Sequence, residues 1–320
     1  MRGLSACPGH NRGVSTLSRL ALGLAALGRP AYINLGRDGA LPASRGVAEL
    51  RAATWDVLDA AYAAGLRRVD TARSYGRAEE FLAGWLTARD RPDVTVTSKW
   101  GYAYVGDWRV DAPVHEVKEH TLDRFRSQLA ETRALLGDRV ALYQVHSLTV
   151  DSPLFTDDAL LGALAELAGS GQRLGFSTSG PAQADTVRRG LELERDGVRL
   201  FDAVQSTWNP LETSAGAALA EAHAAGVEVT VKEALANGRL AVDPPAAVAE
   251  AAERSGTTPD AVALAAALAN PWADVVLLGP AGTAQLRSNL TAADLTAPEL
   301  PDLAQEPGEY WSLRASLAWN

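Results

Sequence analysis

Short apolar runs recur along the chain, and each is followed by a longer stretch in which apolar residues return every three or four positions. The first pattern predicts buried strands and the second predicts amphipathic helices. In one helical stretch Leu122, Phe125 and Leu129 share a face, and Gly137 stands where a left-handed helix cap is expected. The eight predicted strands are LALG (20–23), RRVDTA (67–72), VTVTSK (94–99), VALYQVH (140–146), RLGFST (173–178), AVQSTW (203–208), VEVTVKEA (227–234) and VVLLG (275–279).

Strands that alternate with helices and read as continuous apolar runs favour a parallel sheet covered by helices. Eight such units match a closed (β/α)8 TIM barrel, an α/β fold, better than an open sheet. The segment LALGLAALGRP lacks the GxGxxG fingerprint that follows the first strand of an open dinucleotide-binding sheet. Because no internal linker occurs, residues 19–320 are predicted to form one domain with a C-terminal substrate loop, and residues 1–18 a flexible leader.

Composition narrows the class of protein. The chain has 320 residues, of which 47% are hydrophobic and 22% charged, as in globular proteins with a substantial core. No run of 18 apolar residues occurs and the first residues lack a secretory signal, so a cytoplasmic protein without membrane insertion is expected. The formal charge of −9 counts against nucleic acid as a partner. Cys7 is the only cysteine, so we expect neither a disulfide nor a metal site.

Four residues with reactive side chains stand at the carboxyl ends of successive predicted strands. Asp70 and Tyr75 belong to VDTARSYG, Lys99 ends VTVTSK, and His146 ends VALYQVH. Since a parallel barrel brings the carboxyl ends of its strands to one face, these residues are predicted to meet where barrels carry their active sites. Each residue taken singly has a structural explanation, such as a turn for Asp70 or packing for Tyr75. Their joint occurrence favours a site.

Together the four side chains could supply a proton to a carbonyl oxygen that receives a hydride. An unperturbed tyrosine, with a pKa of about 10, releases its proton reluctantly at neutral pH. The ammonium group of Lys99 is expected to lower the pKa of Tyr75, and Asp70 to hold Lys99 charged and in place. A neutral His146 could donate a hydrogen bond to the substrate oxygen or join the proton relay.

At this point the chain resembles a known family. VDTARSYG, SKW and YQVHS are similar to the motifs that aldo-keto reductases carry on their second, third and fourth strands. The resemblance runs from about residue 19 to 292 and includes GFSTS, QSTWN, LANGRL and LGPAGTAQLRSNL. It implies a (β/α)8 barrel, a nicotinamide cofactor bound across the C-terminal face, NADP(H) more often than NAD(H), and a catalytic tetrad of Asp70, Tyr75, Lys99 and His146.

The resemblance also implies cofactor contacts, with some departures. Trp208 stands where an aromatic residue stacks on the nicotinamide ring, and Ala281 where a base often receives the 2′-phosphate of NADP(H). Arg287 or Arg239 could receive that phosphate instead. The residues implied to bind the cofactor are Gly23, Leu24, Ala25, Ser177, Thr178, Gln205, Trp208, Leu235, Gly238, Gly279, Gly282, Gln285 and Asn289.

Aromatic residues in the loops beside the site suggest where a substrate binds. Trp100, Tyr102, Tyr104 and Trp108 follow the third strand, and the C-terminal EYWSLRASLAW, which contains Trp311, is expected to close over the site. Their apolar rings suggest a lipophilic or aromatic carbonyl compound as the partner. The sequence therefore predicts an NAD(P)H-dependent oxidoreductase that reduces an aldehyde or ketone, with Tyr75 as general acid. A sugar, hemiacetal or secondary-alcohol dehydrogenase that runs the same chemistry in reverse is one alternative, and a non-catalytic nucleotide-binding redox sensor or scaffold is another.

Overall fold

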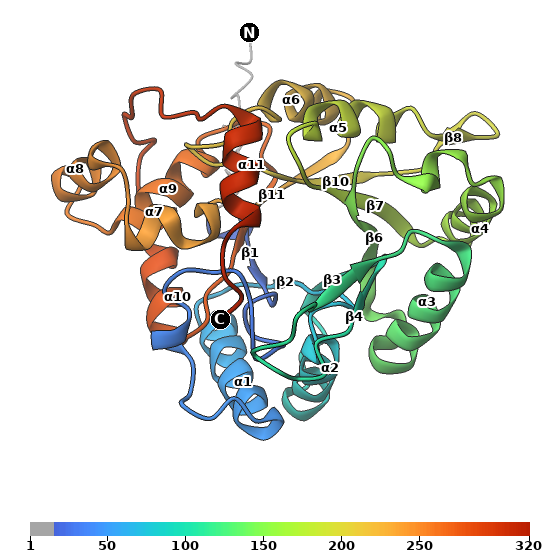
Figure 1. Ribbon diagram of the computed structural model, residues 1–320, viewed down its shortest axis with the longest axis horizontal. Coiled ribbons are helices and arrows are strands. Elements are labelled where there is room, and N and C mark those ends of the chain that lie inside the picture. Colours follow the sequence, from blue (N-terminus) through green and yellow to red (C-terminus); the bar gives the residue numbers. More distant parts are fainter. Residues whose placement is uncertain (1–15) are drawn as a thin grey trace, which may run out of the picture.

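A computed structural model describes residues 16–320, and eight parallel strands close into a barrel in it (Figure 1). The strand order around the barrel is β1-β12-β11-β10-β7-β6-β3-β2, so the first strand pairs with both the last and the second. The predicted α/β barrel and all eight predicted strands are confirmed. The strands are β1 (Leu20–Gly23), β2 (Arg68–Asp70), β3 (Thr95–Trp100), β6 (Val140–Leu148), β7 (Arg173–Thr178), β10 (Ala203–Thr207), β11 (Glu228–Lys232) and β12 (Val275–Leu278).

Helices form a ring outside the strands, as Figure 1 shows. They are α1 (Val47–Ala63), α2 (Ala78–Arg89), α3 (Leu122–Leu136), α4 (Asp158–Gly169), α5 (Gln183–Leu191), α6 (Gly216–Ala224), α7 (Arg239–Val242), α8 (Ala246–Arg254), α9 (Pro259–Leu268), α10 (Thr283–Leu290) and α11 (Pro307–Ala315). Short 3-10 helices are η1 (Thr16–Arg19), η2 (Asp38–Ala40), η3 (Gly137–Arg139), η4 (Pro153–Thr156), η5 (Ala236–Gly238) and η6 (Thr291–Asp294). Two hairpins, β4 (Tyr102–Tyr104) with β5 (Glu116–Lys118) and β8 (Glu194–Arg195) with β9 (Val198–Arg199), complete the structure.

The predicted leader, residues 1–18, lies largely outside the described residues. Its last three residues, 16–18, begin η1, and Leu17 packs against the main hydrophobic core. The described fold therefore starts before residue 19, because the apolar side chain of Leu17 packs against the core.

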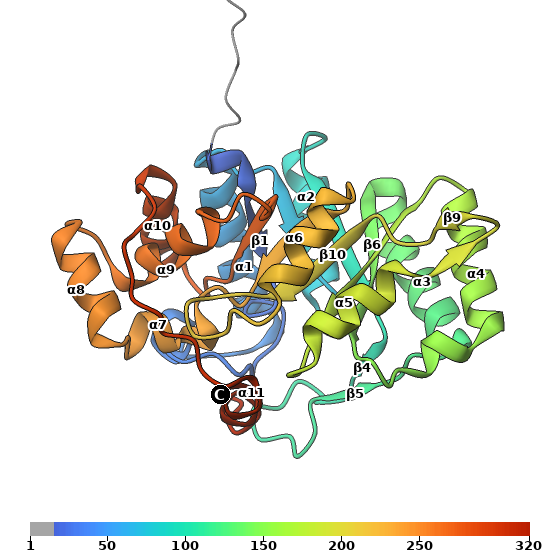
Figure 2. The same cartoon turned by 90° about the horizontal axis from the view of Figure 1, so that it is seen from above.

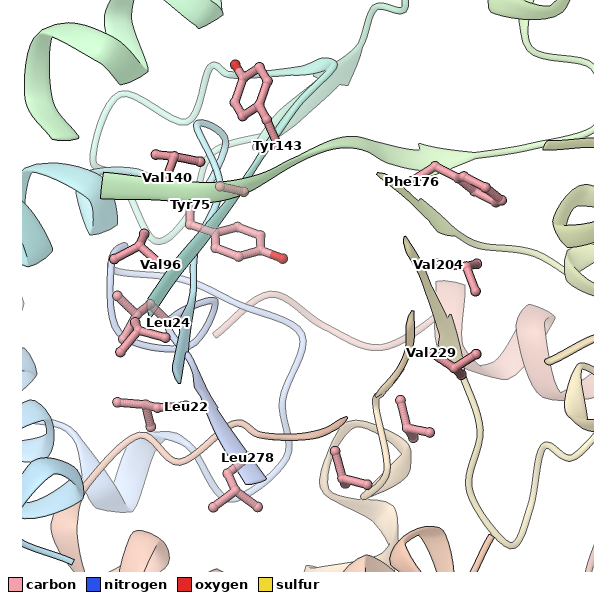
Figure 3. Close-up of a cluster of buried hydrophobic side chains, with 14 of the residues drawn as sticks. Leu22, Leu24, Tyr75, Val96, Val140, Tyr143, Phe176, Val204, Val229 and Leu278 are labelled. Carbon is pink, nitrogen blue, oxygen red and sulfur yellow. The ribbon is translucent and has the colours of Figure 1, made fainter. Parts of the chain in front are cut away.

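Alternation along the strands separates an apolar outer layer from a polar interior. In Figure 3 the side chains of Phe176, Val204, Val229 and Leu278 point outward from their strands, whereas the Tyr75 ring extends into the barrel. All four outward side chains are 0% exposed, which places the main core between the strands and the helices. The residues between them along each strand are left to face the inside, where the polar strand-end residues gather.

One end of the barrel carries the loops that matter for function. Figure 2 shows α11 and the β4–β5 hairpin at the same end of the barrel. At the tail, the backbone N–H and C=O groups of Asn320 each bond to Tyr32, which follows β1. Arg314 of α11 is bidentate to Glu233, with 2.9 Å between Nε and Oε2, so the tail is fastened to the loop after β11 as well.

The loops that follow β1 and β2 touch backbone to backbone. A Cβ at Gly28 would lie 2.2 Å from the carbonyl oxygen of Tyr75, and one at Gly76, where φ is +61°, would lie 2.4 Å from the carbonyl oxygen of Gly28. The N–H of Arg77 donates to that same Gly28 oxygen over 2.7 Å. Glycine at both positions thus permits the contact that positions Tyr75.

We expect Gly28→Ala to lower the free energy of unfolding by about 3 kcal/mol, because the added methyl group must displace backbone rather than a flexible side chain. Gly162→Ala is the matched control, since a Cβ there meets nothing within 4 Å inside α4. That change should stabilise by about 0.5–1 kcal/mol through helix propensity. Urea unfolding of both variants measures the two effects, and equal stabilities would contradict this account of the loop contact.

A second prediction concerns the Arg314–Glu233 pair. Burial alone would raise the pKa of Glu233, but the cations of Arg314 and Lys232 outweigh it and hold that pKa well below its usual 4.5. The unfolded chain then binds the extra proton first, so the pair stabilises the fold fully above about pH 4.5 and progressively less as the pH falls below that value.

Glu233→Gln should therefore lower stability at pH 7 by about 3 kcal/mol, since it leaves buried cations unpaired, and should flatten the loss of stability below pH 4.5. The control is Glu221→Gln, whose carboxylate pairs with Arg188 on the exposed surface. Denaturant unfolding between pH 3 and 7 checks both variants, and an unchanged acid slope in Glu233→Gln would contradict the assignment.

Candidate active site

A buried ion pair lies at the carboxyl ends of β2 and β3. The Nζ of Lys99, a residue with no exposed surface, donates to Asp70 Oδ2 and, over 3.0 Å, to the carbonyl oxygen of Thr71. Asp70 Oδ1 accepts from Thr97 Oγ1 at 2.7 Å and from Gln205 Nε2 at 3.2 Å. The parallel register sets Asp70 opposite Thr97, two residues before Lys99, so both charges face the interior. Each charge is thereby paired and hydrogen-bonded, as burial requires.

Tyr75 lies directly beside this pair. The Lys99 ammonium is 5.1 Å from the centre of the Tyr75 ring, and the ring meets that of His146 edge to face at 5.4 Å. Burial raises the pKa of Tyr75 well above its usual value, and the Asp70 carboxylate raises it further. In the free protein the pKa of Tyr75 is thus raised overall, whereas the sequence predicted a lowered value. Tyr75 holds its proton at neutral pH.

His146 is a neutral imidazole at neutral pH. Burial lowers its pKa well below 6.5, and the cations of Lys99 and Arg29 lower it further. Its Nδ1 lies 3.3 Å from Ser74 Oγ. Its backbone carbonyl lies 2.8 Å from Nε2 of His120. The neutral form expected from the sequence agrees with these surroundings.

A cavity of about 460 Å³ opens beside these residues. Asp70, Tyr75 and His146 line it, whereas Lys99 lies behind Asp70. Eight of the residues that the resemblance assigned to cofactor binding also line it: Gly23, Ala25, Gln205, Leu235, Gly238, Gly279, Gln285 and Asn289.

Four other residues assigned to cofactor binding do not line the cavity. Leu24 is 0% exposed and belongs to the hydrophobic core. The Ser177 hydroxyl accepts from the N–H of Ser147 at 2.8 Å, and the Thr178 hydroxyl bonds to that of Ser206 at 2.6 Å, so both are occupied inside the sheet. Gly282 precedes α10 outside the lining. The lining residue on this side is Ser179, which the sequence analysis missed.

Trp208 does not face the cavity either, which corrects the stacking assignment. The alternation that turns Gln205 inward also turns Thr207 inward, and Trp208 then faces the helices. Its ring packs edge to face on Trp272 at 6.0 Å. Lys232, the last residue of β11, lines the cavity together with Gln205 and donates to Thr207 Oγ1 at 2.8 Å. Burial lowers the pKa of Lys232 to about 8.

The predicted substrate residues are only partly in place. Tyr102 lines the cavity, with its ring 5.1 Å from that of His146. Trp100 is buried against Phe125, with 5.0 Å between ring centres. The indole N–H of Trp108 donates to the carbonyl of Arg45 at 2.8 Å.

Trp311 and Tyr104 are also absent from the cavity lining. Trp311 packs with Tyr310 in a second apolar cluster under α11. The rings of Trp100 and Trp311 are thus buried in the interior, and the half-buried Trp108 packs edge to face on Phe81 outside the cavity. The C-terminal segment does reach the cavity, but through Arg314 and Trp319.

A polar wall that sequence reasoning did not assign lies beside Tyr75. Arg29 and Tyr32 come from the loop after β1, Glu116 from β5, Glu233 from the loop after β11, and Arg314 from α11. Burial lowers the pKa of Arg29, but Glu116 and two tyrosines outweigh it, so the guanidinium stays charged. The burial of loop residues cannot be predicted from sequence periodicity, because loops have none. A buried charge in a loop is recognised only once its partner in the folded chain is known.

The far end of the cavity is polar and acidic. Asp260 accepts from Ser288 Oγ at 2.9 Å and from Asn289 Nδ2 at 2.6 Å. Gln285 donates to the carbonyl of Gly36 at 3.0 Å and so joins the loop after β1 to the loop after β12. The Oδ1 of Asn289 is buried without a hydrogen-bond partner in the described structure. This end thus offers an unpaired acceptor to a ligand.

The two arginines considered as phosphate ligands, Arg287 and Arg239, do not line the cavity. Arg37 does, but its guanidinium donates to the carbonyls of Ala26 and Pro30, both at 2.9 Å, and to that of Asn320 at 2.7 Å.

Among residues 16–320, no group of three or more histidine, cysteine or acidic side chains could hold a metal ion. Within the same residues no helix combines the length and apolar character needed to cross a bilayer.

Comparisons with known proteins agree with the geometry. The sequence profile of the aldo/keto reductase family matches residues 47–304. A curated relative, the aldo-keto reductase str7 of Strobilurus tenacellus, is 29% identical over 241 residues, which span 73% of this chain and 62% of the relative.

Two solved structures support the fold. An aldo-keto reductase of Bacillus halodurans, solved in its holo form, has a TM-score of 0.63 at 19% identity and covers 94% of this chain and 93% of its own. A protein of Pseudomonas aeruginosa assigned to the same group has a TM-score of 0.62 at 23% identity, over 90% of this chain and 94% of its own. Together with the profile match over most of its length, these findings show that the chain belongs to the aldo/keto reductase family.

Proposed function

We propose that this protein interconverts a carbonyl compound and an alcohol with a nicotinamide dinucleotide, and that Tyr75 exchanges the proton with the substrate oxygen. The observation that carries the proposal is the buried Lys99–Asp70 pair beside Tyr75 and His146, next to a cavity. Membership of an oxidoreductase family supports the reaction class.

In this proposal the cavity holds the dinucleotide. It runs from Tyr75 to Gln285 and Asn289, and a Cβ at Gly238, where φ is +91°, would lie 2.6 Å from the carbonyl of Leu35. The loop after β1, which contains Leu35, and the loop after β11, which contains Gly238, therefore approach each other closely. Gln205, whose amide is held by Asp70, and the unpaired Oδ1 of Asn289 would hold the two ends of the cofactor. When bound, the nicotinamide ring supplies or accepts the hydride.

Tyr75, Lys99 and His146 together would transfer a proton to the substrate oxygen. Tyr75 keeps its proton in the free protein, so the phenol can donate to a carbonyl oxygen as negative charge develops there. The resulting phenolate would be stabilised by the Lys99 ammonium, whose Nζ is fixed by Asp70 and Thr71. Neutral His146 can donate a hydrogen bond to the same oxygen and orient it. Alcohol oxidation uses the same groups in reverse.

Tyr75→Phe should lower kcat/KM by about 10²-fold or more, because the phenol is the proton donor, while binding of the dinucleotide is retained. Tyr143→Phe is the matched control, since Tyr143 is also a buried tyrosine and does not line the cavity. Turnover of an aldehyde, ketone and sugar panel with each dinucleotide measures the effect. Binding without any turnover by the unchanged protein would favour the non-catalytic alternative and overturn this proposal.

For the cofactor we propose NAD(H) in preference to the NADP(H) that the family resemblance implied. A desolvated 2′-phosphate needs a free cation. In the described lining, Arg29 is paired with Glu116, Arg37 is satisfied by carbonyls, and Lys232 and Arg314 share Glu233. Asp260 adds a carboxylate at the far end.

Fluorescence titration should therefore give a dissociation constant for NADH no higher than that for NADPH. Asp260→Asn should improve NADPH binding relative to NADH, because it removes a repulsive charge and keeps a hydrogen-bonding group. A clear preference of the unchanged protein for NADPH would contradict this assignment.

A further inference from the structure

The Arg29–Glu116 pair lies in the cavity wall next to Tyr75, and no step of the proposed reaction uses it. Arg29 is 1% exposed, and its Nη1 donates to Glu116 Oε1 at 2.7 Å and to the carbonyl of Ser74 at 3.3 Å. Its Nε donates to the carbonyl of Ala25 at 3.2 Å. The guanidinium carbon is 5.1 Å from the centre of the Tyr75 ring, so the pair borders the place where a reacting carbonyl would lie.

Each partner keeps one polar atom uncommitted. Within residues 16–320 no hydrogen bond reaches Nη2 of Arg29 or Oε2 of Glu116, and neither atom is among the buried polar atoms that lack a partner. Both residues line the cavity. The wall therefore offers an N–H donor and a carboxylate acceptor side by side.

Aromatic rings surround this donor and acceptor. The Arg29 guanidinium is 4.4 Å from the Tyr32 ring and 5.0 Å from the Trp319 ring, and Trp319 is itself stacked on His115 at 4.3 Å. Both rings line the cavity with the pair. A ligand here meets flat apolar faces that can cover C–H groups, beside paired charges that require hydrogen bonds.

These features select among ligand chemistries. A carboxylate or phosphate would approach Glu116 and be repelled, and the cation of Arg29 is already neutralised. A purely apolar chain would strip water from the pair and return no hydrogen bonds. A hydroxyl group both donates and accepts, so it matches Glu116 Oε2 and Arg29 Nη2 together.

We propose that the Arg29–Glu116 pair is a specificity determinant that favours neutral substrates with hydroxyl groups on the carbons next to the reacting carbonyl. This inference rests on the proposed function, since it assumes that Tyr75 marks the reacting carbon. It differs from the lipophilic substrate expected from the sequence, because Trp100, Trp108 and Trp311, on which that expectation rested, do not line the cavity.

Three small aldehydes test the proposal: glyceraldehyde, which carries hydroxyl groups, propanal, which lacks them, and glyoxylate, which is anionic. The unchanged protein should show a kcat/KM for glyceraldehyde at least tenfold above that for propanal. Glu116→Gln should reduce this ratio to threefold or less, mainly through KM, and should raise kcat/KM for glyoxylate because Arg29 is then an unpaired cation. Arg29→Lys should reduce the hydroxyl preference without the gain for glyoxylate.

Glu119→Gln is the control, because Glu119 follows the same hairpin and pairs with Arg124 without lining the cavity. It should leave all three values unchanged. If Glu116→Gln lowered kcat/KM equally for all three aldehydes, the role of Glu116 would be structural and the proposal would be overturned. An absent hydroxyl preference in the unchanged protein, a result that needs no variant to fold, would overturn it as well. If the unchanged protein turned over none of these aldehydes and no compound of the wider panel, the proposed function itself would be overturned.

Discussion

The site depends on one constraint, the burial of a lysine ammonium that must be paired. Lys99 has no exposed surface, so its charge is tolerable only because Asp70 and the Thr71 carbonyl receive its N–H groups. Asp70 is in turn fixed by Thr97 and Gln205, which come from two other strands. The closed barrel thus holds the cation at a set distance from Tyr75. Adjacent strands bring Asp70 and Lys99 together, and closure of the barrel brings Gln205 of β10 to Asp70 as well.

The strands could be predicted well from the sequence because their signals are local. Apolar runs repeat at regular spacing, and reactive residues at their ends must meet once the strands are parallel. Asp70, Lys99 and His146 followed from that rule, and Tyr75 followed because its loop is short. The pKa of Tyr75 could not be predicted, since its direction depends on how fully Asp70 neutralises Lys99 and on how much water remains.

Trp208 shows why the remaining contacts were harder to predict. Resemblance placed an aromatic ring on the cofactor, but the two-residue period of β10 sends that side chain to the helices. The positions of Arg29, Glu116 and Arg314 in the cavity wall could not be predicted for another reason. They come from a loop, a hairpin and a tail that are distant in sequence, and only the folded chain shows that they share one wall.

The charges around the cavity have a consequence for how a ligand approaches. Four cationic residues line it, Arg29, Arg37, Lys232 and Arg314, and four anionic ones, Asp70, Glu116, Glu233 and Asp260; Lys99 behind the lining pairs with Asp70, so the site carries little net charge. The chain as a whole carries −9, and that excess must lie elsewhere on the protein. An anionic ligand arriving from solvent therefore meets long-range repulsion that the nearly neutral lining does not offset. Raising the ionic strength should screen this repulsion and speed the encounter, the opposite of the salt response of a cation-lined cleft.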